Sequence, residues 1–313
     1  MAKKMAANDI SKKYVKMEQR EHVLKKPGMY LGSIDSDIYE LWLLNIDGTK
    51  MEKRTIKYIS GLFKIFDEIV ANASDHYIRL KEIKDNKEIN LVKDIKVNID
   101  KITGIISVTN SGDGIDIALH PEHKIYIPEL IFGNMLTSTN YNDDDKLGVG
   151  QFGIGLKVTN IFSEWFVVET VDAKTKQIYT QRFESNMSVI NPPVIKKYTK
   201  KPYTTIKFKP DYKRFGGGTG LTGLTDDMYE VMRKRVYDLC AIIDKDINIY
   251  FNDEKLEFRT FEKYVDLYIG NKAVHTRVCE EINERWEVIA SYNEFQGFEQ
   301  ISFVNGLLTI RGG

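Results

Sequence analysis

A glycine-rich segment in the middle of the chain, Gly150-Gln-Phe-Gly-Ile-Gly-Leu-Lys157, constrains the fold and chemistry more than any other feature. Its glycines match part of a dinucleotide-binding fingerprint, but such a site follows the first strand of its fold and has an acidic residue about 20 positions later. A P-loop requires Gly-Lys followed by Ser or Thr, and this tripeptide is absent from the chain. The remaining interpretation is a flexible lid that ends at a helix N-terminus, where free N–H groups hold phosphates and Lys157 adds a positive charge.

A helix is predicted upstream of this segment, over about residues 58–80. Its apolar face consists of Leu62, Ile65, Phe66, Ile69, Val70 and Ala73. At about 100° per residue, four polar side chains form a stripe roughly 60° wide beside that face. These polar residues are Glu68, Asn72, Asp75 and Arg79.

The polar stripe has two interpretations. In the first, it is a solvated helix surface with an ion pair between Asp75 and Arg79, worth about 0.3 kcal/mol. In the second, Glu68 is a general base for water, and Asn72, one turn later, offers its carbonyl oxygen to Mg²⁺. Magnesium keeps most of its waters, so one amide oxygen together with phosphate oxygens is chemically sufficient. The helix alone does not separate the two.

A strand that runs into a turn is predicted over residues 105–115. Gly112 and Gly114 allow tight backbone angles or the close approach of a flat ligand. Asn110, at the strand end, is either an ordinary turn residue or a carboxamide that reads the amine and ring nitrogen of adenine. Residues 137–140 (Thr-Ser-Thr-Asn) are likewise either a capping run before a loop or further hydrogen-bond donors for the ligand.

Bulk composition bounds the class of protein. A chain of 313 residues with 42% hydrophobic and 29% charged residues suits two globular domains. The formal net charge is zero, so a nucleic-acid partner requires a local basic surface. The strings 196–201 and 207–214 are either such a surface or simply solvated. Cys240 and Cys279 form neither a disulfide framework nor a metal-binding spacing, which favours an intracellular protein. A secretory signal and an apolar run of about 18 residues are both absent from the sequence.

The expected secondary structure lies on both sides of a glycine-rich boundary, Phe215-Gly-Gly-Gly-Thr-Gly220. Strands are predicted at 94–100, 104–110, 165–171, 177–183, 204–208, 247–252, 286–292 and 299–305. Further helices are predicted at 225–243 and 261–269. The acidic tip Asn142-Asp-Asp-Asp145 is expected in a surface loop or lid, and the closing Thr309-Ile-Arg-Gly-Gly313 indicates a fragment of a longer chain.

Three of these patterns together resemble the nucleotide-binding boxes of the GHKL ATPases, which include gyrase-type topoisomerases, mismatch-repair clamps, ninety-kilodalton heat-shock chaperones and histidine kinases. The boxes are Glu68-x-x-x-Asn72, Asn110-x-Gly-x-Gly114 and Gly150-x-x-Gly153-x-Gly155. Longer strings narrow the resemblance to eukaryotic-type (type IIA) DNA topoisomerase II, from about Tyr14 to the end of the chain. These strings are 61–72, 127–141, Lys157-x-x-Asn160-Ile-Phe-Ser163, Phe303-Val-Asn-Gly306 and Gly312-Gly313.

The resemblance implies an α+β fold, in which a GHKL ATPase α/β sandwich is followed by a transducer domain of ribosomal-protein-S5-like fold. The implied division is an N-terminal arm at 1–20 that straps a homodimer, an ATPase domain at 21–217 and a truncated transducer at 218–313. ATP and Mg²⁺ are the implied cofactors. ATP-driven closure of the dimer would capture double-stranded DNA, in the nucleus or at a site of viral DNA replication. The DNA-cleaving residues and the switch lysine of the family would lie beyond this chain, so the fragment itself would not cleave DNA.

The family's site residues transfer position by position. Glu68 is implied as the base that activates water, Asn72 as the Mg²⁺ ligand, and Tyr14 as a residue that reaches the nucleotide of the partner subunit. The other implied nucleotide contacts are Asp75, His76, Arg79, Asn110, Thr137, Ser138, Thr139, Asn140, Gly150, Gln151, Gly153, Ile154, Gly155, Lys157 and Thr204.

The chain also departs from the family pattern. His76 stands where the family usually has Asn, which would make that contact pH-sensitive or remove it. The residues around the loop glycines are closer to the chaperone branch, and the mixture fits a divergent lineage such as a large DNA virus. Two alternatives follow: a GHKL clamp of chaperone or mismatch-repair type, and a module that kept the fold without catalysis. The second would lack the base or the metal ligand, and Glu68 and Asn72 are both present.

Overall fold

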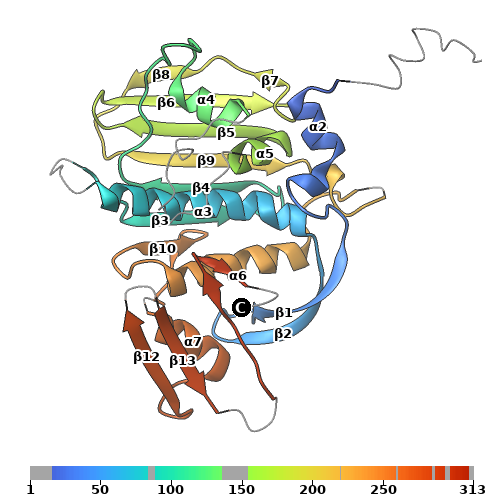
Figure 1. The fold of residues 1–313 in the computed structure, drawn as a ribbon, viewed down its shortest axis with the longest axis vertical. Helices are drawn as coiled ribbons and strands as arrows, with labels where there is room; N and C mark the ends of the chain where they lie inside the picture. Colours follow the sequence, from blue (N-terminus) through green and yellow to red (C-terminus); the bar gives the residue numbers. More distant parts are fainter. Residues whose placement is uncertain are drawn as a thin grey trace, which may run out of the picture.

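A nine-stranded, mainly antiparallel sheet forms the centre of the molecule (Figure 1). The computed structural model describes residues 16–83, 89–135, 154–218, 220–258, 260–283, 286–292 and 297–309. Within that part, β10 and β3 are the one parallel pair in this sheet. The strands follow the order β11 (Glu254–Lys255), β10 (Asn248–Phe251), β3 (Asp94–Ile99), β4 (Ile106–Ser111), β9 (Tyr203–Pro210), β5 (Ser163–Asp172), β6 (Gln177–Glu184) and β7 (Val189–Ile190), while β8 (Val194–Lys197) also pairs with β6.

Alternating side chains make one face of this sheet apolar. In β3, Ile95 and Val97 are fully buried while Lys96 between them is exposed. In β9, Phe208 is fully buried and Lys207 before it is exposed. Because successive side chains of a strand point to opposite faces, this pattern leaves one face for a helical layer and the other for solvent.

Helices cover the apolar face and form the second layer (Figure 1). The long helix α3 (Ser60–Glu82) packs on β3 and β4 and contacts α5 (Gly155–Ile161), which in turn contacts α4 (Ile127–Gly133) and α2 (Gln19–Lys25). Between the layers, Phe166 lies in an aromatic cluster whose ring centroids are 5.9–6.2 Å from its own. The other members of this cluster are Phe132, Phe183 and Phe208.

A second group of elements lies beyond the β10 side of the sheet, in the lower half of Figure 1. Helix α6 (Asp226–Ile242) packs on β10, on α3 and on the hairpin of β1 (Asp37–Leu44) and β2 (Met51–Tyr58). Helix α7 (Phe261–Ile269) packs on α6. The remaining elements are η1 (Pro27–Met29), η2 (Tyr212–Arg214), β12 (Arg277–Asn283), β13 (Trp286–Ser291), β14 (Phe303–Val304) and β15 (Leu307–Leu308). None of the helices in the described ranges is long and apolar enough to cross a membrane.

Most of the predicted elements are confirmed. The helix expected at 58–80 is α3, and the helices expected at 225–243 and 261–269 are α6 and α7. The prediction was wrong at 299–305, where only the two-residue strand β14 forms. The β1–β2 hairpin was not predicted, because one side of β2 faces solvent and its sequence, MEKRTIKY, is polar. The acidic tip at 142–145 lies outside the described residues.

The glycine-rich segment between η2 and α6 contains a turn, in which the backbone N–H of Gly220 donates to the carbonyl oxygen of Gly217 at 2.8 Å. Gly220 has φ +74°, and a Cβ there would lie 2.1 Å from the carbonyl oxygen of Lys213, so only glycine fits. Beyond this turn, α6 packs on α3, and β10 joins the central sheet by pairing with β3. The domain boundary predicted at 217/218 stays a prediction, and the central sheet contains strands from both sides of it.

Candidate functional site

The polar stripe of α3 is the base of the candidate site. The helix has 23 residues, and its buried side includes Ile65, Phe66, Ile69 and Val70. The polar residues predicted for the site lie along its edge: Glu68, Asn72, Asp75 and His76 are half-buried, and Arg79 is exposed. These side chains therefore lie between the buried core and the solvent, where a bound ligand could reach them.

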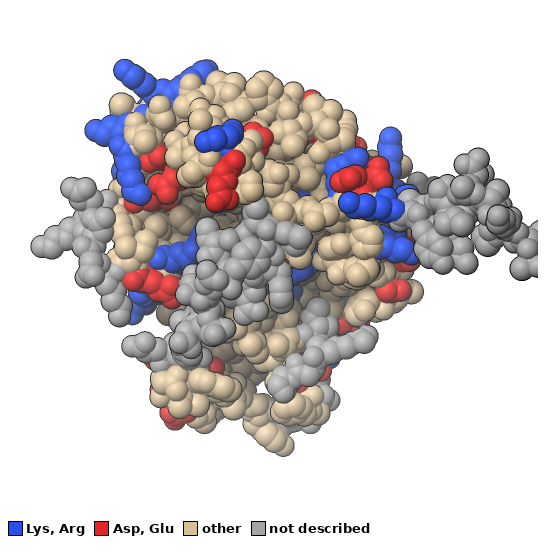
Figure 2. All heavy atoms as spheres, turned by 45° about the horizontal axis from the view of Figure 1, so that its top comes forward, with Lys and Arg blue, Asp and Glu red and all other residues tan. Residues whose placement is uncertain are grey.

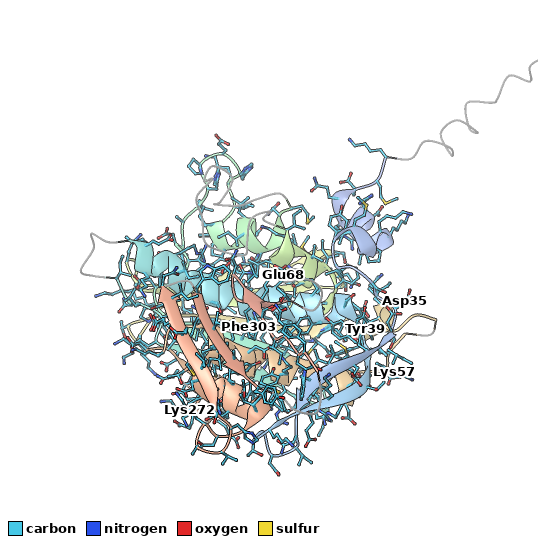
Figure 3. The ribbon with its side chains drawn as sticks, turned by 60° about the horizontal axis from the view of Figure 1, so that its bottom comes forward. Asp35, Tyr39, Lys57, Glu68, Lys272 and Phe303 are labelled. Atoms are coloured by element: carbon cyan, nitrogen blue, oxygen red, sulfur yellow. The ribbon has the colours of Figure 1, made fainter. Side chains whose placement is uncertain are left out.

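Glu68 lies where α3 meets the start of α5 (Figure 3). One carboxylate oxygen, Oε1, forms an ion pair with Nζ of Lys64 at 2.5 Å. The other, Oε2, packs against Gly155, where an added Cβ would lie only 1.8 Å away. The hydroxyl of Thr159 on α5 donates to the carbonyl oxygen of Ile65 on α3 at 3.0 Å and fixes the two helices together. Gly155 is thus a glycine because the carboxylate occupies the space of a side chain.

Asn72 lies one turn after Glu68, and its Nδ2 donates to the backbone carbonyl oxygen of Glu68. This bond engages the amide nitrogen, so the side-chain oxygen Oδ1 is the atom suited to a cation. Among the described residues, no group of three or more His, Cys, Asp or Glu side chains is arranged to hold a metal. A single amide oxygen fits Mg²⁺, because this ion keeps most of its waters and takes its other ligands from phosphates.

His76 connects α3 to the loop that follows β4. Its Nε2 donates to the carbonyl oxygen of Asp113 at 2.6 Å, and its Nδ1 accepts from Nη2 of Arg79 at 3.2 Å. This pairing requires the neutral imidazole. Burial, together with the nearby guanidinium of Arg79, lowers the pKa of His76 to about 4. In this structure, His76 therefore links Arg79 to the glycine turn, and the nucleotide contact predicted for it stays a prediction.

The turn at Asn110–Gly114 docks on the end of β5. Asn110 is buried and pairs across the sheet with Thr204, whose hydroxyl contacts that of Thr170 at 2.8 Å. Thr170 Oγ1 also accepts from the backbone N–H of Ile115. A Cβ on Gly114 would lie 2.2 Å from the carbonyl oxygen of Val171, so this glycine permits a close backbone approach. The structure therefore confirms a strand running into a tight turn and places Asn110 beside Thr204.

Lys157 lies in the first turns of α5 and is buried, with 2% of its surface exposed. Burial lowers the pKa of Lys157 to about 8. Burial makes the charged form of a lysine costly, and an anionic ligand beside it would offset part of that cost. Ile154 is the N-cap residue of the same helix.

Several predicted site residues lie outside the described residues: Tyr14, Thr137, Ser138, Thr139, Asn140, Gly150, Gln151 and Gly153. Seven of the described ones form three local groups: Glu68 with Asn72 and Gly155, Asn110 with Thr204, and His76 with Arg79. The other three are Asp75 on α3 and Ile154 and Lys157 at the start of α5. Sequence reasoning missed Lys64, Asp113 and Thr170. The spacing of Lys64 and Glu68, four residues apart on a helix, was a readable signal, whereas the other two are brought in by the fold.

Known proteins resemble this chain in sequence and in fold. A family model described as "Histidine kinase-, DNA gyrase B-, and HSP90-like ATPase" matches residues 58–182. DNA topoisomerase 2 of Meyerozyma guilliermondii is 42% identical over 98% of this chain, and that of Acanthamoeba polyphaga mimivirus is 41% identical over 97%. The chain spans only 22% and 24% of the lengths of these two relatives.

Among solved structures, the chain is similar to the ATPase region of Saccharomyces cerevisiae topoisomerase II. The TM-score is 0.86 at 42% identity, and the match covers 96% of this chain and 76% of the other. Similarity of this extent in both sequence and fold favours the topoisomerase over the chaperone and mismatch-repair alternatives. The chain therefore belongs to the type II DNA topoisomerase family and corresponds to its ATPase region.

Proposed function

We propose that this chain binds and hydrolyses ATP as the N-terminal gate of a type II DNA topoisomerase. One observation carries the proposal: the Glu68 carboxylate packs against Gly155, where the glycine-rich segment becomes helix α5. The family model that covers both residues is that of an ATPase. A phosphate gripped by the glycine-rich segment would therefore lie beside a carboxylate able to accept a proton.

The proposed reaction is attack of water on the terminal phosphorus of ATP. The water oxygen forms a bond to phosphorus, the bond to the bridging oxygen of ADP breaks, and Glu68 accepts the proton of the water. Lys64 holds one carboxylate oxygen, so the other faces the start of α5. Backbone N–H groups and Lys157 on α5 would stabilise the charge that develops on the phosphate. Mg²⁺, held through Asn72, would supply further neutralisation of phosphate charge.

The remaining site residues receive roles along the nucleotide. Asn110 and Thr204, with Asp75, His76 and Arg79 at the edge of α3, would line the adenine and sugar end. Residues Thr137, Ser138, Thr139 and Asn140 would hold ribose and phosphate, and Gly150, Gln151, Gly153 and Ile154 would wrap the phosphates. Tyr14 would reach across from a second subunit.

The proposed partners are a second copy of this chain and double-stranded DNA. ATP would close the dimer because contacts to the γ-phosphate form only in the closed state. The two relatives reported above are both named DNA topoisomerase 2, and DNA is therefore the proposed substrate. On the face drawn in Figure 2, Lys and Arg lie in several separate clusters with Asp and Glu beside them, so DNA contact on this face would be local. The place of action would be the nucleus or, following the mimivirus relative, a site of viral replication or the virion.

Replacing Glu68 by Gln should leave nucleotide binding intact and abolish hydrolysis. The amide keeps the size of the carboxylate but cannot accept the proton, so we expect phosphate release to fall by about 10²- to 10⁴-fold. Calorimetry with a non-hydrolysable ATP analogue measures the binding. Glu52→Gln on the exposed side of β2 is the control and should hydrolyse normally. Wild-type turnover in Glu68→Gln would remove Glu68 from the role of base.

Replacing Gly155 by Ala should act through Glu68. The new Cβ would lie 1.8 Å from Oε2, so the carboxylate has to move, and a displacement of about 1 Å is enough to cost about 100-fold in rate. Gly223→Ala is the matched control, because an added Cβ there meets nothing within 4 Å. The double variant with Glu68→Gln should be no slower than Glu68→Gln alone. A Gly155→Ala protein that hydrolyses ATP like the wild type contradicts the assignment.

Nucleotide affinity should depend on pH through Lys157. Its pKa in the free protein is about 8, and anionic phosphates would raise it. Below pH 8 the lysine is already charged, so it contributes no pH dependence. Above pH 8 binding must take up a proton, and affinity should fall by up to about tenfold per pH unit. Titration calorimetry between pH 7 and 10 measures this slope.

The control for that titration is Lys157→Met, which keeps the buried aliphatic volume. It should bind more weakly at pH 7 and lose the slope above pH 8. An unchanged slope in Lys157→Met would assign the pH dependence to another group.

A further inference from the structure

Helix α3 is held by α6 on a side different from the one that meets α5. Asp67, the residue before Glu68, accepts from Nε of Arg235 on α6 at 2.6 Å. Both side chains are buried, with 6% and 4% of their residue surfaces exposed. Burial and the nearby Asp67 carboxylate also raise the pKa of Tyr58 well above its usual range, so the phenol beside this pair stays neutral.

Helix α6 also holds the end of β2 and the start of α3. Its Asp227 accepts from the backbone N–H of Lys57, which is labelled in Figure 3, at 2.9 Å. The sulfur of Met228 accepts from the backbone N–H of Ile59, the N-cap residue of α3, at 3.3 Å. Contacts at the helix start and at Asp67 lie about two turns apart along α3. Two such contacts limit the rotation of the helix about its axis more tightly than either contact alone.

Helix α6 is itself firmly seated. Nζ of Lys234 contacts both carboxylate oxygens of Asp238 at 2.8 Å, and the pair is fully buried. The hydroxyl of Tyr264 on α7 donates to Asp238 at 2.6 Å and lies 2.7 Å from that of Tyr268. The support behind Arg235 is therefore a network that joins α6 to α7, and not one exposed side chain.

Small rotations of α3 matter because its carboxylates lie far from the helix axis. Side chains extend to a radius of about 5–6 Å, so a rotation of about 20° moves a carboxylate by roughly 2 Å. A misplacement of about 1 Å can cost about 100-fold in a catalysed rate. A buried ion pair, by contrast, often adds no net stability compared with apolar residues of the same volume.

We propose that Arg235, paired with Asp67, is a positioning residue that sets the rotation of α3 and so the place of Glu68 beside Gly155. Asp67 and Glu68 differ by about 100° around the helix, so the first is held by α6 while the second meets α5. The role rests on the proposed function, because positioning matters only if Glu68 serves as the base. It predicts an effect on the rate of hydrolysis and not on nucleotide affinity.

The test replaces the ion pair by apolar residues of similar size, Asp67→Leu with Arg235→Met, in the full chain. We expect kcat to fall about 10- to 100-fold, with the affinity for a non-hydrolysable ATP analogue within threefold of wild type. Thermal unfolding should shift by only a few degrees, since the pair is exchanged as a whole. Arg233→Met is the matched control: Arg233 lies on the same helix but contacts Glu230 and the β1–β2 turn, so kcat should stay within twofold.

Three outcomes would overturn the positioning role. They are an unchanged kcat in the double variant, equal losses of kcat and affinity, and a loss of kcat in Arg233→Met as large as in the double variant. If the double variant fails to fold, Arg235→Lys takes its place, because it keeps the charge but not the guanidinium geometry. It should lower kcat at least fivefold without changing affinity, and an unchanged kcat would contradict the proposal.

Failure of the proposed function is distinguishable from failure of this inference. If the Glu68→Gln protein hydrolyses ATP normally, Glu68 is not the base, and this holds whichever result the Asp67→Leu/Arg235→Met protein gives. If Glu68→Gln is inactive and the Asp67→Leu/Arg235→Met protein is fully active, the role of Glu68 as base stands. Only the positioning role of Arg235 is then contradicted.

Discussion

The contact between the Glu68 carboxylate and the backbone of Gly155 is the constraint on which the site depends. It exists only because residue 155 lacks a side chain and because α5 begins there. Everything that fixes α3 against α5 serves this contact, from the apolar side of α3 to the hydroxyl bridge between Thr159 and Ile65. A carboxylate on a long helix packed into the core is held more rigidly than one on a loop.

The sheet and the helical layer follow from simple periodicities. The apolar spacing of residues 58–80 predicted α3 because a helix buries one stripe, and the alternation of Ile95, Val97 and Ile99 predicted β3 because a strand buries every second residue. The β1–β2 hairpin was not predicted, because a strand with one solvent-facing side has few apolar residues in its sequence. Sequence also indicated a boundary at the 215–220 turn, while the continuation of the sheet into β10 is set by long-range pairing with β3.

The candidate site was predictable where chemistry is local in sequence. Glu68 and Asn72 lie one turn apart, and each glycine box is a short segment. Contacts between distant segments were not predictable: Asp67 and Arg235 are 168 positions apart, and the bond from His76 to Asp113 depends on how the turn after β4 docks. The residue type at 76 signalled a departure from the family, but only the fold shows the imidazole holding Arg79 and the turn.

A crystal structure of this chain with Mg²⁺ and a non-hydrolysable ATP analogue tests the central claim most directly. The account predicts one water molecule between the Glu68 carboxylate and the terminal phosphorus, within about 2.6–3.2 Å of a carboxylate oxygen and in line with the bond to be broken. A terminal phosphate bound far from Glu68, with no space for an attacking water between them, would contradict it.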